Sequence, residues 1–108
     1  MTSQPDAVEA PVHTLIAPNR LTSDHRLEFR RAALEILERA VRAEASRIDV
    51  DLGATAEMDA SGLGVLVLLQ KRARERGLRI RLLNPSRAIR EMLQLTRLDA
   101  FFEFAAPE

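Results

Sequence analysis

The stretch Met58-Asp59-Ala60-Ser61-Gly62-Leu63-Gly64 decides how this chain folds, because it marks the passage from a loop into a helix. Asp59 and Ser61 are residue types that cap helix N-termini, where backbone N–H groups have no partner within the helix. Two glycines in the first turns weaken a helix, so a specific reason for them is expected. They leave the Ser61 hydroxyl accessible to a large partner and let a second backbone or a phosphate come close.

On spacing alone, the simplest interpretation is that Ser61 or Asp59 caps the helix and that the glycines allow close packing on a sheet. A nucleotide-binding loop is disfavoured, because the third glycine of a dinucleotide fingerprint and the Lys-Ser/Thr pair of a P-loop are both missing. A serine hydrolase is disfavoured as well. Ser61 lacks glycines two residues away on both sides, and both histidines lie early in the chain.

Strand and helix patterns alternate on both sides of this stretch. Apolar residues recur at three- and four-residue spacing where helices are expected, and every second residue is apolar where strands are expected. The alternation predicts a single-domain α/β fold, with a small mixed β-sheet of about four strands and helices packed mainly on one face. The predicted strands span residues 12–17, 47–53 and 78–82, and the predicted helices span residues 26–44, 61–76 and 88–95.

Three shorter segments are less regular. Residues 20–24 form a turn or a short strand, and Thr22, Ser23 and Asp24 are candidate caps for the helix that follows. Residues 54–59 form a loop, and residues 101–104 form a final strand or a packed tail. Residues 1–11 are polar or small with two prolines, which predicts a flexible tail ahead of one domain at 12–108.

The composition excludes several classes of function. Sixteen basic and sixteen acidic residues cancel, so no positive field draws nucleic acid directly. The absence of cysteine excludes disulfides and Cys-based zinc sites, and two histidines do not suggest a metal site. No apolar run is long enough for membrane insertion, and the start of the chain is not a secretory signal. We expect a cytoplasmic protein without metal or cofactor.

Two acidic residues next to the central stretch could suggest catalysis. Asp49 and Asp51 alternate with apolar residues on a predicted strand. We interpret them as structural groups that pair or cap near the end of the sheet, rather than as an acid–base pair.

Several separated blocks resemble the signature of STAS domains, a family named for sulphate transporters and anti-sigma factor antagonists. The signature corresponds to Asp51-Leu52-Gly53 followed by Asp59-Ala60-Ser61-Gly62-Leu63-Gly64. Residues 76–84, 85–96 and 98–102 resemble the family's later crossover, last helix and closing segment, so the resemblance covers about residues 26–104. The N-terminus departs from the pattern: Asn19-Arg20-Leu21-Thr22 replaces the usual motif, and Asp24 is displaced by two positions from the usual aspartate.

The resemblance implies an anti-sigma factor antagonist, which is a binding module and not an enzyme. An anti-sigma factor that is also a serine kinase would phosphorylate Ser61 of this chain. A PP2C-type phosphatase would remove the phosphate. A monomer or weak homodimer is expected. The alternative is a non-switching STAS module, either in a stressosome-like scaffold or as an accessory subunit of a membrane lipid-transport complex. The expected partner-binding residues are Asp24, Met58, Asp59, Ala60, Ser61, Gly62, Leu63 and Gly64.

Overall fold

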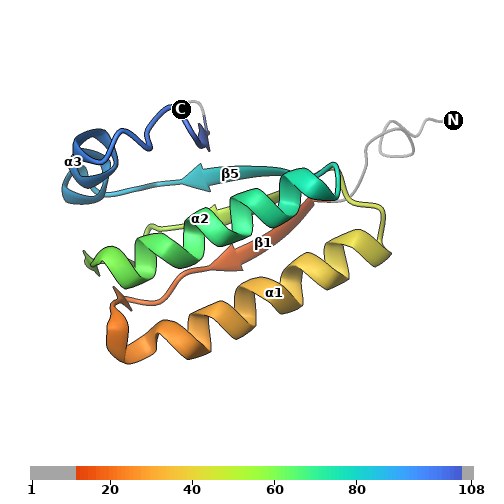
Figure 1. Cartoon of the computed structure of the whole chain (residues 1–108), viewed down its shortest axis with the longest axis horizontal. Coiled ribbons are helices and arrows are strands. Elements are labelled where there is room, and N and C mark those ends of the chain that lie inside the picture. The colour runs from red at the N-terminus through yellow and green to blue at the C-terminus, as the bar shows by residue number, and fades with distance from the viewer. Residues whose placement is uncertain (1–11, 106–108) are drawn as a thin grey trace, which may run out of the picture.

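Helical crossovers between neighbouring strands give the fold its layered form (Figure 1). The computed structural model describes residues 12–105. Its main sheet has four strands in the order β1-β3-β5-β6. These strands are β1 (Val12–Ile16), β3 (Arg47–Asp51), β5 (Arg79–Leu83) and β6 (Glu103–Phe104), and the helices between them are α1 (Arg26–Arg42), α2 (Ala60–Glu75) and α3 (Arg87–Leu95).

All three neighbouring strand pairs of this sheet run parallel, so the prediction of a mixed sheet is wrong. The physical reason lies in the connections. Each one contains a helix, which carries the chain back to the end where the preceding strand began, so the next strand runs in the same direction. The α/β class and the four strands are confirmed. Figure 1 shows α1 and α2 side by side on one face of the sheet, and α3 beyond the end of β5.

The hydrophobic core lies between the sheet and the two long helices. The apolar spacing that predicts a helix over residues 26–44 corresponds to the buried stripe of α1, because positions three and four apart share one face. The strands bury one side through the alternation of their side chains. The core side chains of α1, α2 and the two central strands are Phe29, Ala33, Ile36, Leu37, Ala40, Leu63, Val65, Leu66, Leu69, Ala73, Ile48, Val50, Ile80 and Leu82.

A second, two-stranded sheet lies beside the start of α2. It pairs β2 (Arg20–Leu21) with β4 (Glu57–Met58) in parallel. The short strand near residue 21 is therefore confirmed, whereas β4 lies in a segment that we expected to be a loop. A 3-10 helix, η2 (Ser23–His25), leads directly into α1.

The predicted caps of α1 are wrong. The residue at its N-cap position is His25, and neither His25 nor Thr22 ahead of η2 makes a side-chain capping bond. The backbone supplies the reason: the N–H of Arg26 already donates to the carbonyl of Ser23, so the 3-10 turn takes the place of a side-chain cap.

The face of the sheet opposite α1 and α2 carries a charged row built around Asp49. Arg47 and Arg81 hold its carboxylate at N–O distances of 2.7 and 3.0 Å, and only 7% of the side chain is exposed. Burial raises the pKa of Asp49, but hydrogen bonds and charges from the two arginines outweigh it, so the pKa is lowered overall. Asp51 accepts a hydrogen bond from the N–H of Gly53 at 2.8 Å. Both carboxylates have structural partners, which confirms the interpretation from the sequence.

The predicted tail at residues 1–11 lies outside the described residues. Within residues 12–105, no helix is long and apolar enough to cross a membrane.

Removal of the Asp49 charge tests how much this row stabilises the fold. We expect Asp49→Asn to lower the free energy of unfolding by about 2 kcal/mol at neutral pH, because Arg47 and Arg81 then lose the carboxylate that lies between them. The control is Glu91→Gln, which breaks the exposed Arg87–Glu91 pair and should cost less than about 0.5 kcal/mol. Urea unfolding measures both, and equal losses would contradict the assignment.

Candidate functional site

Hydrogen bonds hold the loop ahead of α2 against the segment that follows β1. The N–H of Asp59 donates to the carbonyl of Leu21 at 3.1 Å, and the N–H of Ala56 donates to the carbonyl of Asn19 at 2.8 Å. These bonds come from the pairing of β2 with β4, which the sequence did not predict. The loop therefore has a fixed position relative to residues 19–21, although it contains little regular structure.

The carboxylate of Asp59 connects three backbone groups at this point. Its Oδ1 accepts hydrogen bonds from the N–H groups of Ser61 at 2.9 Å and Gly62 at 3.1 Å, and its Oδ2 accepts one from Ser23 at 3.0 Å. Of the two candidate caps in the sequence, Asp59 is thus the N-cap of α2. The bond from Gly62 lowers the pKa of Asp59 most, the bonds from Ser23 and Ser61 add to this effect, and partial desolvation opposes it.

Ser61 occupies the second position of α2 and is half-buried. Asp59 binds its backbone N–H, and in the described part of the chain its hydroxyl forms no hydrogen bond. Ser61, Ala60 and Gly64 line a groove of about 550 Å³ between the starts of α1 and α2. The hydroxyl therefore lies in the first turn of α2, on a backbone bound by Asp59, while the oxygen itself has no partner within the described residues.

The two glycines have different roles. A Cβ atom at Gly62 would lie 2.2 Å from the carbonyl oxygen of Leu21, so this residue lets the backbone of β2 pack against the helix. A Cβ atom at Gly64 would meet nothing within 4 Å. Gly64 is exposed and leaves the groove next to Ser61 open. Gly62 is thus the glycine that lets a second backbone come close to the helix. Gly64 is the glycine that leaves space beside the Ser61 side chain.

The structure places the remaining predicted residues at different depths. Met58 is half-buried and packs against the hydrophobic core, and Leu63 is 6% exposed and belongs to that core. Leu63 therefore supports the loop from beneath. Asp24 is exposed on η2, one residue after the Ser23 N–H that binds Asp59. Of the predicted residues, Asp24, Ala60 and Gly64 are thus exposed, whereas Met58, Asp59 and Ser61 are half-buried.

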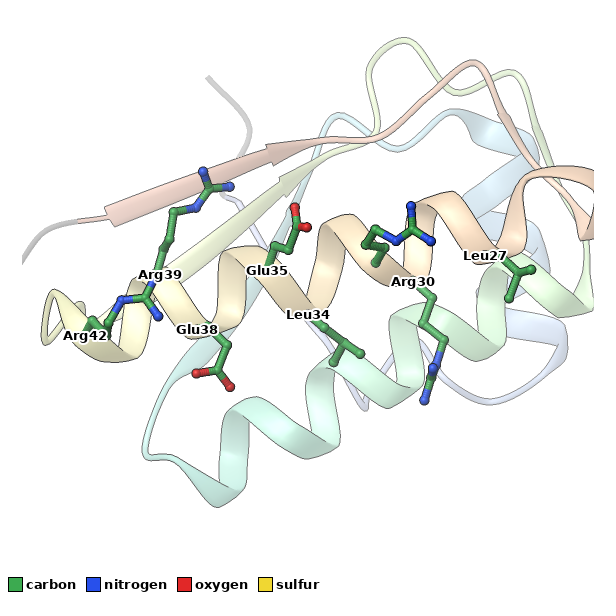
Figure 2. Close-up of a pocket in the computed structure, with 8 residues that line it drawn as sticks. Leu27, Arg30, Leu34, Glu35, Glu38, Arg39 and Arg42 are labelled. Atoms are coloured by element: carbon green, nitrogen blue, oxygen red, sulfur yellow. The ribbon is translucent and has the colours of Figure 1, made fainter.

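Two residues that the sequence analysis missed also line the groove. Arg26 and Arg30 lie on α1, across the groove from Ser61, together with Leu27. Leu27 and Arg30 also line a second groove of about 690 Å³ along α1, shown in Figure 2. No sequence signal identified them, because both are exposed positions on a helix rich in charged residues.

The chemistry of this site is that of a presented hydroxyl. Within residues 12–105, no group of three or more histidine and carboxylate side chains could hold a metal ion. Both described histidines belong to the N-terminal third of the chain, at positions 13 and 25. The arrangement at α2 leaves the Ser61 hydroxyl without a hydrogen-bond partner in the described region, beside a groove and on a backbone that Asp59 binds.

A family model described as "Mlab, STAS domain" matches residues 12–103, which is most of the chain. The chain belongs to the STAS domain family. The match confirms the resemblance seen in the sequence and includes β1 and β2, where the sequence departs from the usual pattern. None of the curated proteins matches this STAS domain.

Solved structures with 14–23% identity share the fold of this STAS domain. TM1081 of Thermotoga maritima, a candidate anti-sigma factor antagonist, is 23% identical with a TM-score of 0.73, over 87% of this chain and 80% of that one. Phosphorylated SpoIIAA of Bacillus is 21% identical with a TM-score of 0.62, over 92% and 86%. A sulfate transporter family protein of Wolinella succinogenes is 14% identical with a TM-score of 0.68, over 94% and 84%.

The two glycines provide a matched pair of variants. Gly62→Ala should destabilise the fold by about 3 kcal/mol, because the new methyl group overlaps the backbone of Leu21 and something must move. Gly64→Ala should stabilise it by about 1 kcal/mol, because alanine favours the helix and meets no neighbour. Chemical denaturation of the two variants checks both signs. If the two alanines had the same effect, the packing of β2 against α2 would be wrongly described.

The Asp59 cap predicts a specific pH dependence. Because the pKa of Asp59 is lower in the folded chain than in the unfolded one, its carboxylate stabilises the fold above about pH 4. That contribution is lost as the pH falls through the folded value. Asp59→Asn keeps a capping oxygen but does not titrate, so its thermal midpoint should fall less between pH 5 and pH 2 than that of the wild type.

The control for this measurement is Asp24→Asn, which removes an exposed carboxyl group beside the same loop. Its thermal midpoint should follow the wild-type profile. A wild-type profile in Asp59→Asn would show that the cap does not contribute to the acid sensitivity.

Proposed function

We propose that this STAS domain is a cytoplasmic anti-sigma factor antagonist switched by phosphorylation of Ser61. In the unphosphorylated state it binds an anti-sigma factor that is also a serine kinase, and the sigma factor is released. Phosphorylation of Ser61 ends this binding, and a PP2C-type phosphatase restores it. The observation that carries the proposal is the Ser61 hydroxyl, which has no partner in the described region and opens onto a groove from a fixed loop.

For the phosphoryl transfer, this domain only has to hold the Ser61 hydroxyl in the correct position. The kinase supplies ATP and Mg²⁺, and the Ser61 oxygen attacks the γ-phosphorus in line with the leaving group. A bond forms between Oγ and phosphorus, and the bond from phosphorus to the β–γ bridging oxygen breaks, so ADP leaves. The hydroxyl proton passes to a base of the kinase. The domain is therefore a substrate and a binding module, needs no cofactor, and performs no catalysis of its own.

The charge of the phosphate explains how the switch would act. A phosphate adds about two negative charges beside the carboxylate of Asp59. Asp59 keeps its three backbone bonds, so the loop and the fold remain in place. A partner surface that packs against this loop must then desolvate a doubly charged group, which is costly. The modification thus changes the interface rather than the fold.

The fold comparisons support this proposal. SpoIIAA is an anti-sigma factor antagonist whose structure exists in unphosphorylated and phosphorylated forms, and both forms share the fold of this chain. The proposal transfers that role to this domain through the residues that match the family signature, Asp59-Ala60-Ser61-Gly62-Leu63-Gly64. Asp24, Met58 and the groove residues of α2 would contact the partner directly, and Leu63 would support them.

A second candidate is a STAS module that does not switch. The family model is described as Mlab, and one neighbour belongs to the sulfate transporter family. In that role the domain would be an accessory subunit of a membrane lipid-transport complex, or would assemble with its relatives in a stressosome-like scaffold. Stable co-purification with an ATPase subunit would identify the first role, and a large oligomer would identify the second. The switch predicts a monomer or weak homodimer.

The switch is tested with Ser61→Ala and with phosphoserine incorporated at position 61 during translation. Ser61→Ala, used as bait, should retain a kinase from the native cells that phosphorylates the wild type but not the variant. The phosphorylated form should bind that kinase about 100-fold more weakly, because desolvating a doubly charged phosphate in the interface is costly. Ser86→Ala is the control, because it removes a serine hydroxyl from the start of a different helix, α3. This variant should still be phosphorylated by the kinase, and phosphate at Ser61 should weaken its binding as in the wild type. Equal binding of the two forms would contradict the switch.

A further inference from the structure

The groove beside Ser61 contains two arginines that form no ion pair within residues 12–105. Arg26 and Arg30 on α1 line it together with Ser61 and Gly64 on α2. The two arginines are four residues apart, so they lie on the same face of α1. Figure 2 shows the side chain of Arg30 extending from α1 toward α2.

These two guanidinium groups are available for a ligand. Both residues are exposed. Within residues 12–105, the ion pairs use other arginines, at positions 20, 47, 79, 81 and 87. A guanidinium group presents several N–H donors in a planar arrangement that matches phosphate oxygens.

A phosphate on Ser61 would find two of the first-turn N–H groups of α2 already engaged. The N–H groups of Ser61 and Gly62, which would otherwise attract an anion to the start of α2, already donate to Asp59. The elements packed around this point also carry negative charge, at Asp24 on η2 and at Glu57 on β4. Glu57 is paired with Arg20 at 2.9 Å. Cations that have no partner in the described chain are found on the other wall of the groove, on α1.

We propose that Arg26 and Arg30 bind the phosphate of phosphorylated Ser61 across this groove, and that the phosphate thereby connects α1 to α2. The inference rests on the proposed function for its biological use, since a kinase must deliver the phosphate. Its consequence is that phosphorylation alters the exposed surface of two helices while the fold stays the same. The phosphate binds both guanidinium groups and covers the groove next to Leu27. A partner protein can then no longer contact this part of α1 or the loop ahead of α2.

The test measures the second pKa of the phosphate group by phosphorus NMR. Phosphoserine is incorporated at position 61 during translation, so the experiment does not depend on a kinase. Cations close to a phosphate favour its fully ionised form and lower this pKa. The variant Arg26→Gln/Arg30→Gln should therefore raise the second pKa by about one unit relative to the wild-type background.

The matched control is Arg39→Gln/Arg42→Gln, which removes the same charge from the same helix. Arg39 and Arg42 line the other groove and are not among the residues that line the groove of Ser61. This control should leave the second pKa within about 0.2 units of the wild type, because exposed charges at a distance are screened. The unphosphorylated Arg26→Gln/Arg30→Gln chain should keep the wild-type thermal midpoint, which shows that it is folded.

Two results would overturn the inference: no change in the second pKa when Arg26 and Arg30 are replaced, or an equal change in the control. Either would leave the proposed function standing, because a kinase could still modify Ser61. Conversely, a chain that is never phosphorylated in its own cells would refute the proposed function, although the phosphate made by incorporation would still report on the two arginines.

Discussion

The site depends on one interaction, the carboxylate of Asp59 bound to three backbone N–H groups. It joins the segment after β2 to the first turn of α2, with hydrogen bonds of 2.9–3.1 Å to Ser23, Ser61 and Gly62. The contact brings the backbone of Leu21 so close to the helix that only glycine fits at position 62. The Ser61 hydroxyl is thus presented by a backbone that is fixed from both sides, and a covalent change at the oxygen need not disturb the fold.

The parallel sheet explains why the site forms where it does. Because every crossover contains a helix, the strands point the same way and their carboxyl ends meet at one edge. The loops that leave β1 and β3 at this edge pair as β2 and β4, and they place the starts of α1 and α2 next to each other. The groove that contains Ser61, Arg26 and Arg30 follows from this arrangement.

Local features of the fold could be predicted from the sequence, and features that depend on tertiary pairing could not. The spacing of Phe29, Ala33 and Ile36 predicts α1, and the order of strands and helices predicts the α/β class, because both are encoded in short-range patterns. The pairing of β2 with β4 involves two residues in each strand, which is too short for any periodicity. The same distinction holds for the site. Asp59 and Ser61 could be predicted because their residue types are typical of a helix start. The position of Arg26 and Arg30 beside Ser61 could not, because it depends on how α1 packs against α2.

The most direct measurement is the intact mass of the protein isolated from its own cells, before and after phosphatase treatment, with the modified residue mapped by fragmentation. The structure places Ser61 in the first turn of α2, where it lines a groove and its hydroxyl has no hydrogen-bond partner within residues 12–105. We therefore expect a fraction of the molecules to carry one phosphate, located on Ser61 and removed by the phosphatase. A phosphate on a different residue, or no phosphate under any growth condition, would contradict the proposal that Ser61 is the switch.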